Sequence, residues 1–169
     1  MTLNLNDPQN DIVTLNGALV VPPLSEARLR EQPSGVLDAD GALVENAISW
    51  TSSTQPVNGA PTVPAGAPIR DLPGHYLFGG IFYGHFGHFI VESLSRIWAL
   101  DALRGRLDGI IFTPKVAQVT DQTVAGFREM LAAFGINIPI VIAHQVTRVE
   151  TLSVPRQGFG MFDLIEGSA

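Results

Sequence analysis

The second half of the chain alternates between short, continuous apolar runs and longer stretches with helical spacing. The runs at 75–82, 108–112 and 138–143 predict strands that are buried on both faces, because such strands show no polar alternation. Residues 85–103 and 120–134 have helical character and no interior proline. Strands that alternate with helices in this way predict a parallel sheet.

The ends of these elements support the same prediction. Thr120 and Asp121 can cap the second helix, and Gly135 terminates it. Residues 147–154 alternate between apolar and polar, as a half-buried strand does. We therefore expect an α/β fold, with a Rossmann-like parallel sheet and helices on both of its faces.

The first part of the chain differs in its amino-acid composition. It is rich in Pro, Asn, Gly, Ser and Thr, with short apolar runs at 17–21 and 42–50 that predict strands, and an irregular connection at 51–68. We expect an irregular N-terminal segment with short strands over residues 1–70 and the Rossmann-like domain over 71–158. Residues 159–169 are expected to begin a linker or a truncated second domain.

Composition excludes several classes of function. With 46% hydrophobic and 15% charged residues, the chain can build a core. Its net charge of −6, with a single lysine and scattered arginines, argues against nucleic acid as a partner. The absence of cysteine excludes disulfides, thiolate metal sites and cysteine nucleophiles. Because the sequence shows neither a signal-peptide pattern nor an apolar run of about 18–20 residues, we expect a cytoplasmic location.

The most function-like feature is a set of ionisable residues in the first predicted helix. At about 100° per residue, His85, His88, Glu92 and Arg96 fall within a sector of roughly 80°. Most of the remaining circumference is apolar, which predicts a buried helix. Its polar groups must therefore find partners or line a cleft. An ordinary helical pair of Glu92 with Arg96, together with two core histidines, would also account for the stripe.

Three kinds of chemistry fit this segment. His85, His88 and Glu92 could bind a metal, although their spacing is not the H-E-x-x-H zinc pattern and a fourth ligand is missing. Alternatively, His88 oriented by Glu92 could act as a general base or acid on a hydroxyl group, with Arg96 holding an anion or fixing the carboxylate. Glycines at the start of the helix could bind phosphate, but their spacing matches neither a dinucleotide fingerprint nor a P-loop: Gly79, Gly80, Gly84 and Gly87.

The same segment resembles glycosyltransferase family 61, which includes proteins of capsular polysaccharide biosynthesis. The family pattern is close to Asn-x-x-His-Phe/Trp-Leu-x-Glu-x-Leu-Pro-Arg-Leu. Its His, aromatic, Glu, Leu and Arg positions coincide with His88, Phe89, Glu92, Leu94 and Arg96. His85 stands where the family has Asn, and Ser95 where it has Pro. The Phe-Gly-Ile at 134–136 and the Leu-Ser-Val-Pro at 152–155 are similar to the family as well.

This resemblance implies the acceptor-side, N-terminal domain of a GT-B glycosyltransferase that takes a nucleotide-sugar as co-substrate and needs no metal or other cofactor. It implies catalytic roles for His88, Glu92 and Arg96, and substrate contacts for His85, Gly84 and Gly87. The expected partners are a nucleotide-sugar donor and a glycan or saccharide acceptor. A homo-oligomer and peripheral membrane association are left open. So are two other classes of function, a metal-dependent hydrolase and a non-catalytic binding or assembly domain.

Overall fold

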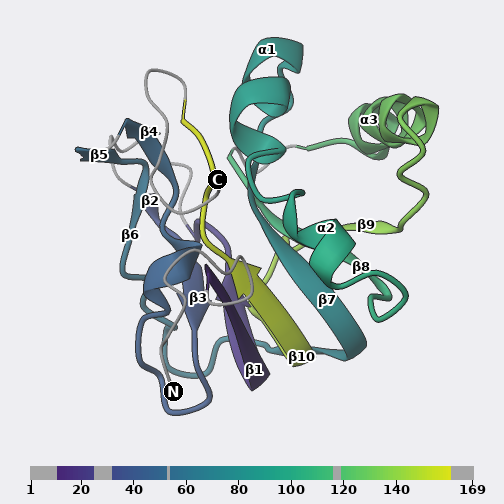
Figure 1. Cartoon of the computed structure of the whole chain (residues 1–169). Coiled ribbons are helices and arrows are strands. Elements are labelled where there is room, and N and C mark those ends of the chain that lie inside the picture. The colour runs from purple at the N-terminus through teal and green to yellow at the C-terminus, as the bar shows by residue number, and fades with distance from the viewer. Residues whose placement is uncertain (1–10, 25–31, 53, 116–118, 161–169) are drawn as a thin grey trace, which may run out of the picture.

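The fold is built on a six-stranded mixed sheet. A computed structural model describes residues 11–24, 32–52, 54–115 and 119–160. The strand order is β3-β1-β10-β7-β8-β9 (Figure 1). The strands are β1 (Ile12–Val21), β3 (Gly35–Leu37), β7 (Arg70–Phe82), β8 (Gly109–Pro114), β9 (Ile140–Ile142) and β10 (Thr147–Pro155). Strands β10, β7, β8 and β9 are parallel to one another, whereas β1 runs antiparallel to both β10 and β3.

The prediction of a parallel sheet is therefore only partly correct, because β1 runs antiparallel to its two neighbours. The parallel part comes from the region where strands and helices alternate, as predicted, but β1 adds an antiparallel strand from the N-terminal segment. Eight residue pairs join β1 to β10, from the pairing of Ile12 with Pro155 to that of Val20 with Thr147. The segment 1–70 and the domain 71–158 thus share one sheet.

The two faces of the sheet are covered differently (Figure 1). One face packs against η3 (Phe89–Ser93), α2 (Ala99–Ala102) and α3 (Asp121–Ala133), whereas α1 (Phe86–His88), which leads into η3, buries no residue. The other packs against the N-terminal segment through Ala47 of the short 3₁₀ helix η2 (Glu45–Ala47) and through Val44, which precedes this helix. The expectation of helices on both faces is corrected accordingly, because an irregular segment takes the place of one helical layer.

Several predicted elements are confirmed. The apolar runs at 75–82, 108–112 and 138–143 lie largely in β7, β8 and β9, and the alternating run lies in β10. Thr120 caps α3 by accepting a hydrogen bond from the Thr123 backbone N–H, and Gly135 follows the helix with φ +81°. The strand expected at 42–50 is wrong, since that stretch holds η2 and only the first residue of β4 (Trp50–Ser52). Short pairs add β2 (Gln32–Pro33) with β6 (Asn58–Gly59), and β4 with β5 (Gln55–Pro56).

The helix expected over 85–103 is interrupted. A π-helical turn, η3, follows α1, and the Leu94 N–H donates to the carbonyl of Phe89 five residues earlier. The Ser95 hydroxyl then donates to the Glu92 carbonyl, and the Gly158 N–H donates to the Ser95 carbonyl. Because these groups engage backbone that a regular helix would use, residues 94–98 form turns before α2 begins. The predicted stripe assumed about 100° per residue, and beyond η3 the backbone no longer follows that rotation. Arg96 therefore does not share a face with His88 and Glu92.

Two glycines in β7 make room for larger side chains. A Cβ atom on Gly79 would lie 2.2 Å from the Phe112 ring, and one on Gly80 would lie 2.6 Å from the Arg96 guanidinium. Gly80 also has φ +90°, which favours glycine. The register with β8 shifts at this point, between Phe78 and Gly80. These two glycines thus serve close packing within a strand, not phosphate binding at a helix N-terminus.

Two predictions fall wholly or partly outside the described residues. The linker or second domain expected at 159–169 lies outside them from residue 161 onward, and the first ten residues of the N-terminal segment lie outside them as well. Within the described part, no helix combines the length and the apolar character that crossing a membrane requires.

Gly79→Ala tests the packing argument. We expect it to lower the free energy of unfolding by about 1–3 kcal/mol, because the added methyl group must displace the Phe112 ring. Urea denaturation measures the change. The matched control is Gly126→Ala in α3, where nothing lies within 4 Å of the added Cβ, and which should stabilise the protein by about 0.5–1 kcal/mol. Equal effects from the two substitutions would contradict close packing at Gly79.

Candidate functional site

A buried carboxylate and a half-exposed imidazole form the centre of the candidate site. Nδ1 of His88 lies 2.5 Å from Oε2 of Glu92. The Glu92 side chain is 6% exposed and the His88 side chain 43%. An ionised carboxylate only accepts hydrogen bonds, so Nδ1 donates and Nε2 keeps its lone pair. The pair therefore presents a base on an imidazole that solvent and small molecules can reach.

The bond forms because α1 and the first turn of η3 keep helical spacing over four residues. His88 has α-helical dihedral angles, and Phe89 donates its N–H to the carbonyl of His85. Residues four apart on such a turn lie on the same face. The predicted stripe is thus correct for His88 and Glu92, where the backbone is still helical.

Tyr83 is the third member of the cluster. Its ring stacks on the His88 imidazole, with ring centroids 5.2 Å apart and planes inclined by 17°. Burial raises the pKa of Tyr83, and the negative charge of Glu92 and hydrogen bonding to its carboxylate raise it further. The phenol is therefore protonated over the physiological range and lies close to the carboxylate.

Lys115 is the fourth member and the chain's one lysine. Its Nζ lies over the Tyr83 ring, 5.8 Å from the centroid, in a cation–π contact. Burial lowers the pKa of Lys115, while the charge of Glu92 acts in the opposite direction. The Glu92 carboxylate thus interacts with three groups: the imidazole of His88, the phenol of Tyr83 and the ammonium of Lys115.

The sheet explains why these residues meet. Phe82 ends β7 and Pro114 ends β8, and the two are paired in register. Tyr83 and Lys115 are the next residues along each strand, and the Lys115 N–H donates to the Phe82 carbonyl. The cluster therefore lies at the carboxyl ends of two adjacent parallel strands, where open α/β sheets bind their ligands.

The expected substrate contacts lie beside the pair. Gly84, His85 and Gly87 are all exposed; the first two lie in the turn that leads from β7 into α1, and Gly87 lies within α1. The ring of His85 stands edge-on to that of His88, with centroids 5.7 Å apart. These three residues form an open rim next to the imidazole.

Arg96 lies elsewhere, contrary to the prediction. It is fully buried, at 0% exposed, and therefore cannot touch a substrate. It does not pair with Glu92 as an i,i+4 partner, because the chain leaves the helix after η3. Its nitrogen atoms donate instead to the carbonyls of Pro155, Asn46 and Ile48 and to the hydroxyl of Ser49. Arg96 is thus a structural residue that joins the N-terminal segment to the end of β10.

Burial of the Arg96 guanidinium lowers its pKa. Loss of solvation lowers the pKa of Arg96 to about 9, and the guanidinium also stands 5.6 Å from the centroid of the Phe78 ring. A buried cation is tolerated where several acceptors satisfy its N–H groups.

Sequence reasoning missed Tyr83 and Lys115. Two signals could have found them: each directly follows a buried strand, and Lys115 is the one lysine of a chain with nine arginines.

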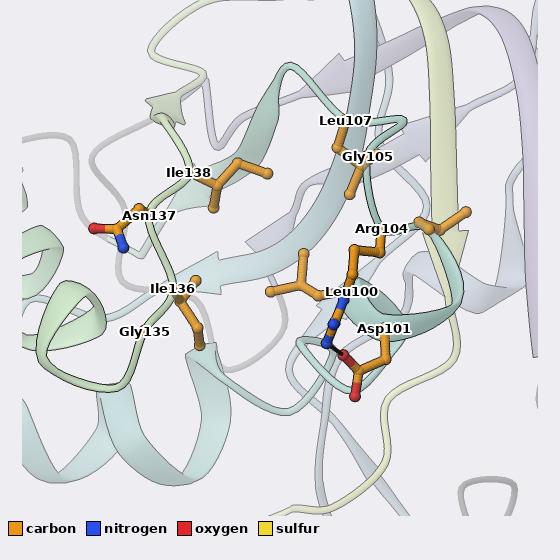
Figure 2. Close-up of a pocket in the computed structure, with 10 residues that line it drawn as sticks. Leu100, Asp101, Arg104, Gly105, Leu107, Gly135, Ile136, Asn137 and Ile138 are labelled. Atoms are coloured by element: carbon orange, nitrogen blue, oxygen red, sulfur yellow. Dashed lines mark hydrogen bonds and ion pairs between the residues drawn. The ribbon is translucent and has the colours of Figure 1, made fainter.

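Two hollows of the described surface lie at the other end of the strands. One of about 430 Å³ lies between α2, the end of α3 and the segment before β9, lined by Leu100, Leu107, Ile136 and Ile138 (Figure 2). An exposed ion pair of Arg104 with Asp101 lies on its rim. This hollow contains no histidine, and none of the four clustered residues lines it.

Comparison of the chain with protein-family models, with curated proteins and with solved structures finds no match.

Arg96→Met tests the structural assignment. The variant keeps an apolar stem but leaves three carbonyls and one hydroxyl without their donor, so we expect a loss of about 3 kcal/mol or more in the free energy of unfolding. Arg104→Met is the control, because its ion pair with Asp101 is exposed and should contribute less than about 1 kcal/mol. Arg96→Met with wild-type stability would overturn the assignment.

Glu92→Gln tests the electrostatics of the cluster. Because the carboxylate raises the pKa of both Tyr83 and Lys115, its neutralisation should lower both. Tyr83 stays above its ordinary value through burial, which is the larger cause. Ultraviolet absorbance follows tyrosine ionisation, and the pH dependence of reductive methylation follows the chain's one lysine. Unchanged titration of both groups would place Glu92 too far away to act on them.

Proposed function

We propose that this chain is the acceptor-side domain of a glycosyltransferase, with His88 as the general base. The observation that carries the proposal is the bond from His88 Nδ1 to the buried Glu92 carboxylate. It leaves the Nε2 lone pair on a ring that is 43% exposed. A base of this kind takes a proton from a hydroxyl group, and Glu92 stabilises the imidazolium that results.

The proposed reaction is a displacement at the anomeric carbon of a nucleotide-sugar. Nε2 of His88 takes the proton of an acceptor hydroxyl as its oxygen forms a bond to that carbon. The bond from the carbon to the diphosphate breaks, and the nucleoside diphosphate leaves with the electron pair. The configuration at the anomeric carbon is inverted, because the acceptor oxygen attacks opposite the leaving group.

The choice of a sugar substrate rests on the resemblance to glycosyltransferase family 61. The coinciding positions include His88 and Glu92, the two residues that form the short bond. On this proposal the four parallel strands β10, β7, β8 and β9 form the Rossmann-like part of a GT-B enzyme. A second domain would bind most of the nucleotide-sugar. A glycan or saccharide acceptor, catalysis without a metal and a cytoplasmic location belong to the same proposal.

The exposed rim supports a place for the acceptor. Gly84 and Gly87 carry no side chains, and His85 stands edge-on to His88. A saccharide approaching Nε2 from solvent would meet this rim first. We assign His85 to a hydrogen bond with a second hydroxyl of the acceptor, and the two glycines to its close approach.

The geometry favours a base over a metal-dependent hydrolase. Nδ1 of His88 and Oε2 of Glu92, two atoms that a metal would need as ligands, are hydrogen-bonded to each other instead. A binding or assembly domain would differ from the enzyme by binding nucleotide-sugars or glycans without releasing nucleoside diphosphate.

His88→Ala and Glu92→Gln test the proposal. Nucleotide-sugars and saccharide acceptors are screened with the protein, and transfer is measured as release of nucleoside diphosphate. We expect His88→Ala to lower kcat about 10²–10⁴-fold, which is the usual contribution of general-base catalysis. Glu92→Gln should lower it less, because the imidazole is retained.

The control for these variants is His144→Ala. His144 is an exposed histidine that follows β9, and it should leave the rate unchanged. Transfer at the wild-type rate in both the His88 and the Glu92 variants would show that the pair is structural. Binding of the donor without turnover in any condition would favour the binding domain instead.

A further inference from the structure

Tyr83 stands between the sheet and the proposed base. Its backbone N–H donates to the Ser93 hydroxyl at 3.0 Å, and that hydroxyl donates to the Ile81 carbonyl at 2.8 Å. Ser93 is the last residue of η3 and is fully buried. The end of β7 is therefore tied to the π-helical turn that carries Glu92.

The bond to Glu92 alone does not fix the orientation of the His88 ring. A single hydrogen bond fixes one atom of the imidazole, and the plane can still turn about it. The stacking of Tyr83 on His88, at an inclination of 17°, constrains the plane. The same side chain also lies close enough to Glu92 to interact with its carboxylate, so one residue acts on both members of the pair.

We propose that Tyr83 is a positioning residue, which holds the His88 ring in one plane and in the tautomer that leaves Nε2 unprotonated. This inference rests on the proposed role of His88 as the base. Tyr83 does so by stacking on the imidazole and by sharing the Glu92 carboxylate. Lys115, whose Nζ lies over the Tyr83 ring, is packed against the positioning residue. The charged and titratable groups around the pair are Tyr83, Lys115 and, beside His88, His85.

Tyr83→Leu and Tyr83→Phe separate the two contributions. The leucine variant removes both the ring and the hydroxyl, and the phenylalanine variant removes the hydroxyl alone. Long-range ¹⁵N–¹H correlation spectra at a pH of about 8, where an ordinary imidazole is neutral, distinguish the two tautomers of each histidine. The exchange of the Nδ1 proton of His88 with water is measured in the same samples.

In the wild-type protein we expect His88 as a single tautomer with its proton on Nδ1. Tyr83→Leu should convert it into a mixture of tautomers. Tyr83→Phe should keep the single tautomer but speed the exchange of the Nδ1 proton several-fold, because the Glu92 carboxylate loses its interaction with the phenol. Tyr76→Phe is the matched control: it removes the hydroxyl of the chain's other tyrosine, which lies in β7, the strand that Tyr83 follows, and should change neither quantity.

The inference is overturned if both Tyr83 variants keep the tautomer and the exchange rate of the wild-type protein. If the amide spectrum shows that Tyr83→Leu does not fold, the exchange rate in Tyr83→Phe decides alone. No substrate is used, so the outcome is independent of sugar transfer. A protein without transferase activity in which Tyr83 still controls the tautomer would lose the proposed function but keep the positioning role.

Discussion

The guanidinium of Arg96 lies at the point where three parts of the chain meet. A buried cation requires an acceptor for its N–H groups, and these acceptors come from residues 46–49 and from Pro155 at the end of β10. To accommodate it, β7 carries glycine at position 80, in a conformation that other residues rarely adopt. The N-terminal segment is thereby held on the face of the sheet where a second layer of helices was expected.

The break after η3 separates Arg96 from the candidate site. Ser95 and Gly158 engage backbone groups there, and residues 94–98 form turns. Arg96 consequently lies in the core and not beside Glu92. His88 and Glu92 lie before the break, where helical spacing still brings their side chains together.

What the sequence could predict depended on how local each signal was. The buried strands, the capped helix α3 and the pair of His88 with Glu92 each follow from residues within a few positions of one another. The antiparallel pairing of β1 with β10 joins distant parts of the chain, such as Ile12 and Pro155, and no local sequence pattern predicts it. Arg96 was misjudged because its acceptors are distant in sequence. Tyr83 and Lys115 were missed because only the register of β7 with β8 brings them together.

The position of β10 also bears on how the chain folds. Of the six strands of the sheet, this one comes last in sequence, yet it lies between β1 and β7. Until it is in place, β1 has no partner that connects it to the parallel strands, and Arg96 lacks its acceptor at Pro155. Contacts this distant close large loops and slow folding. During synthesis, β1 therefore cannot pair with the parallel part of the sheet until β10 has left the ribosome.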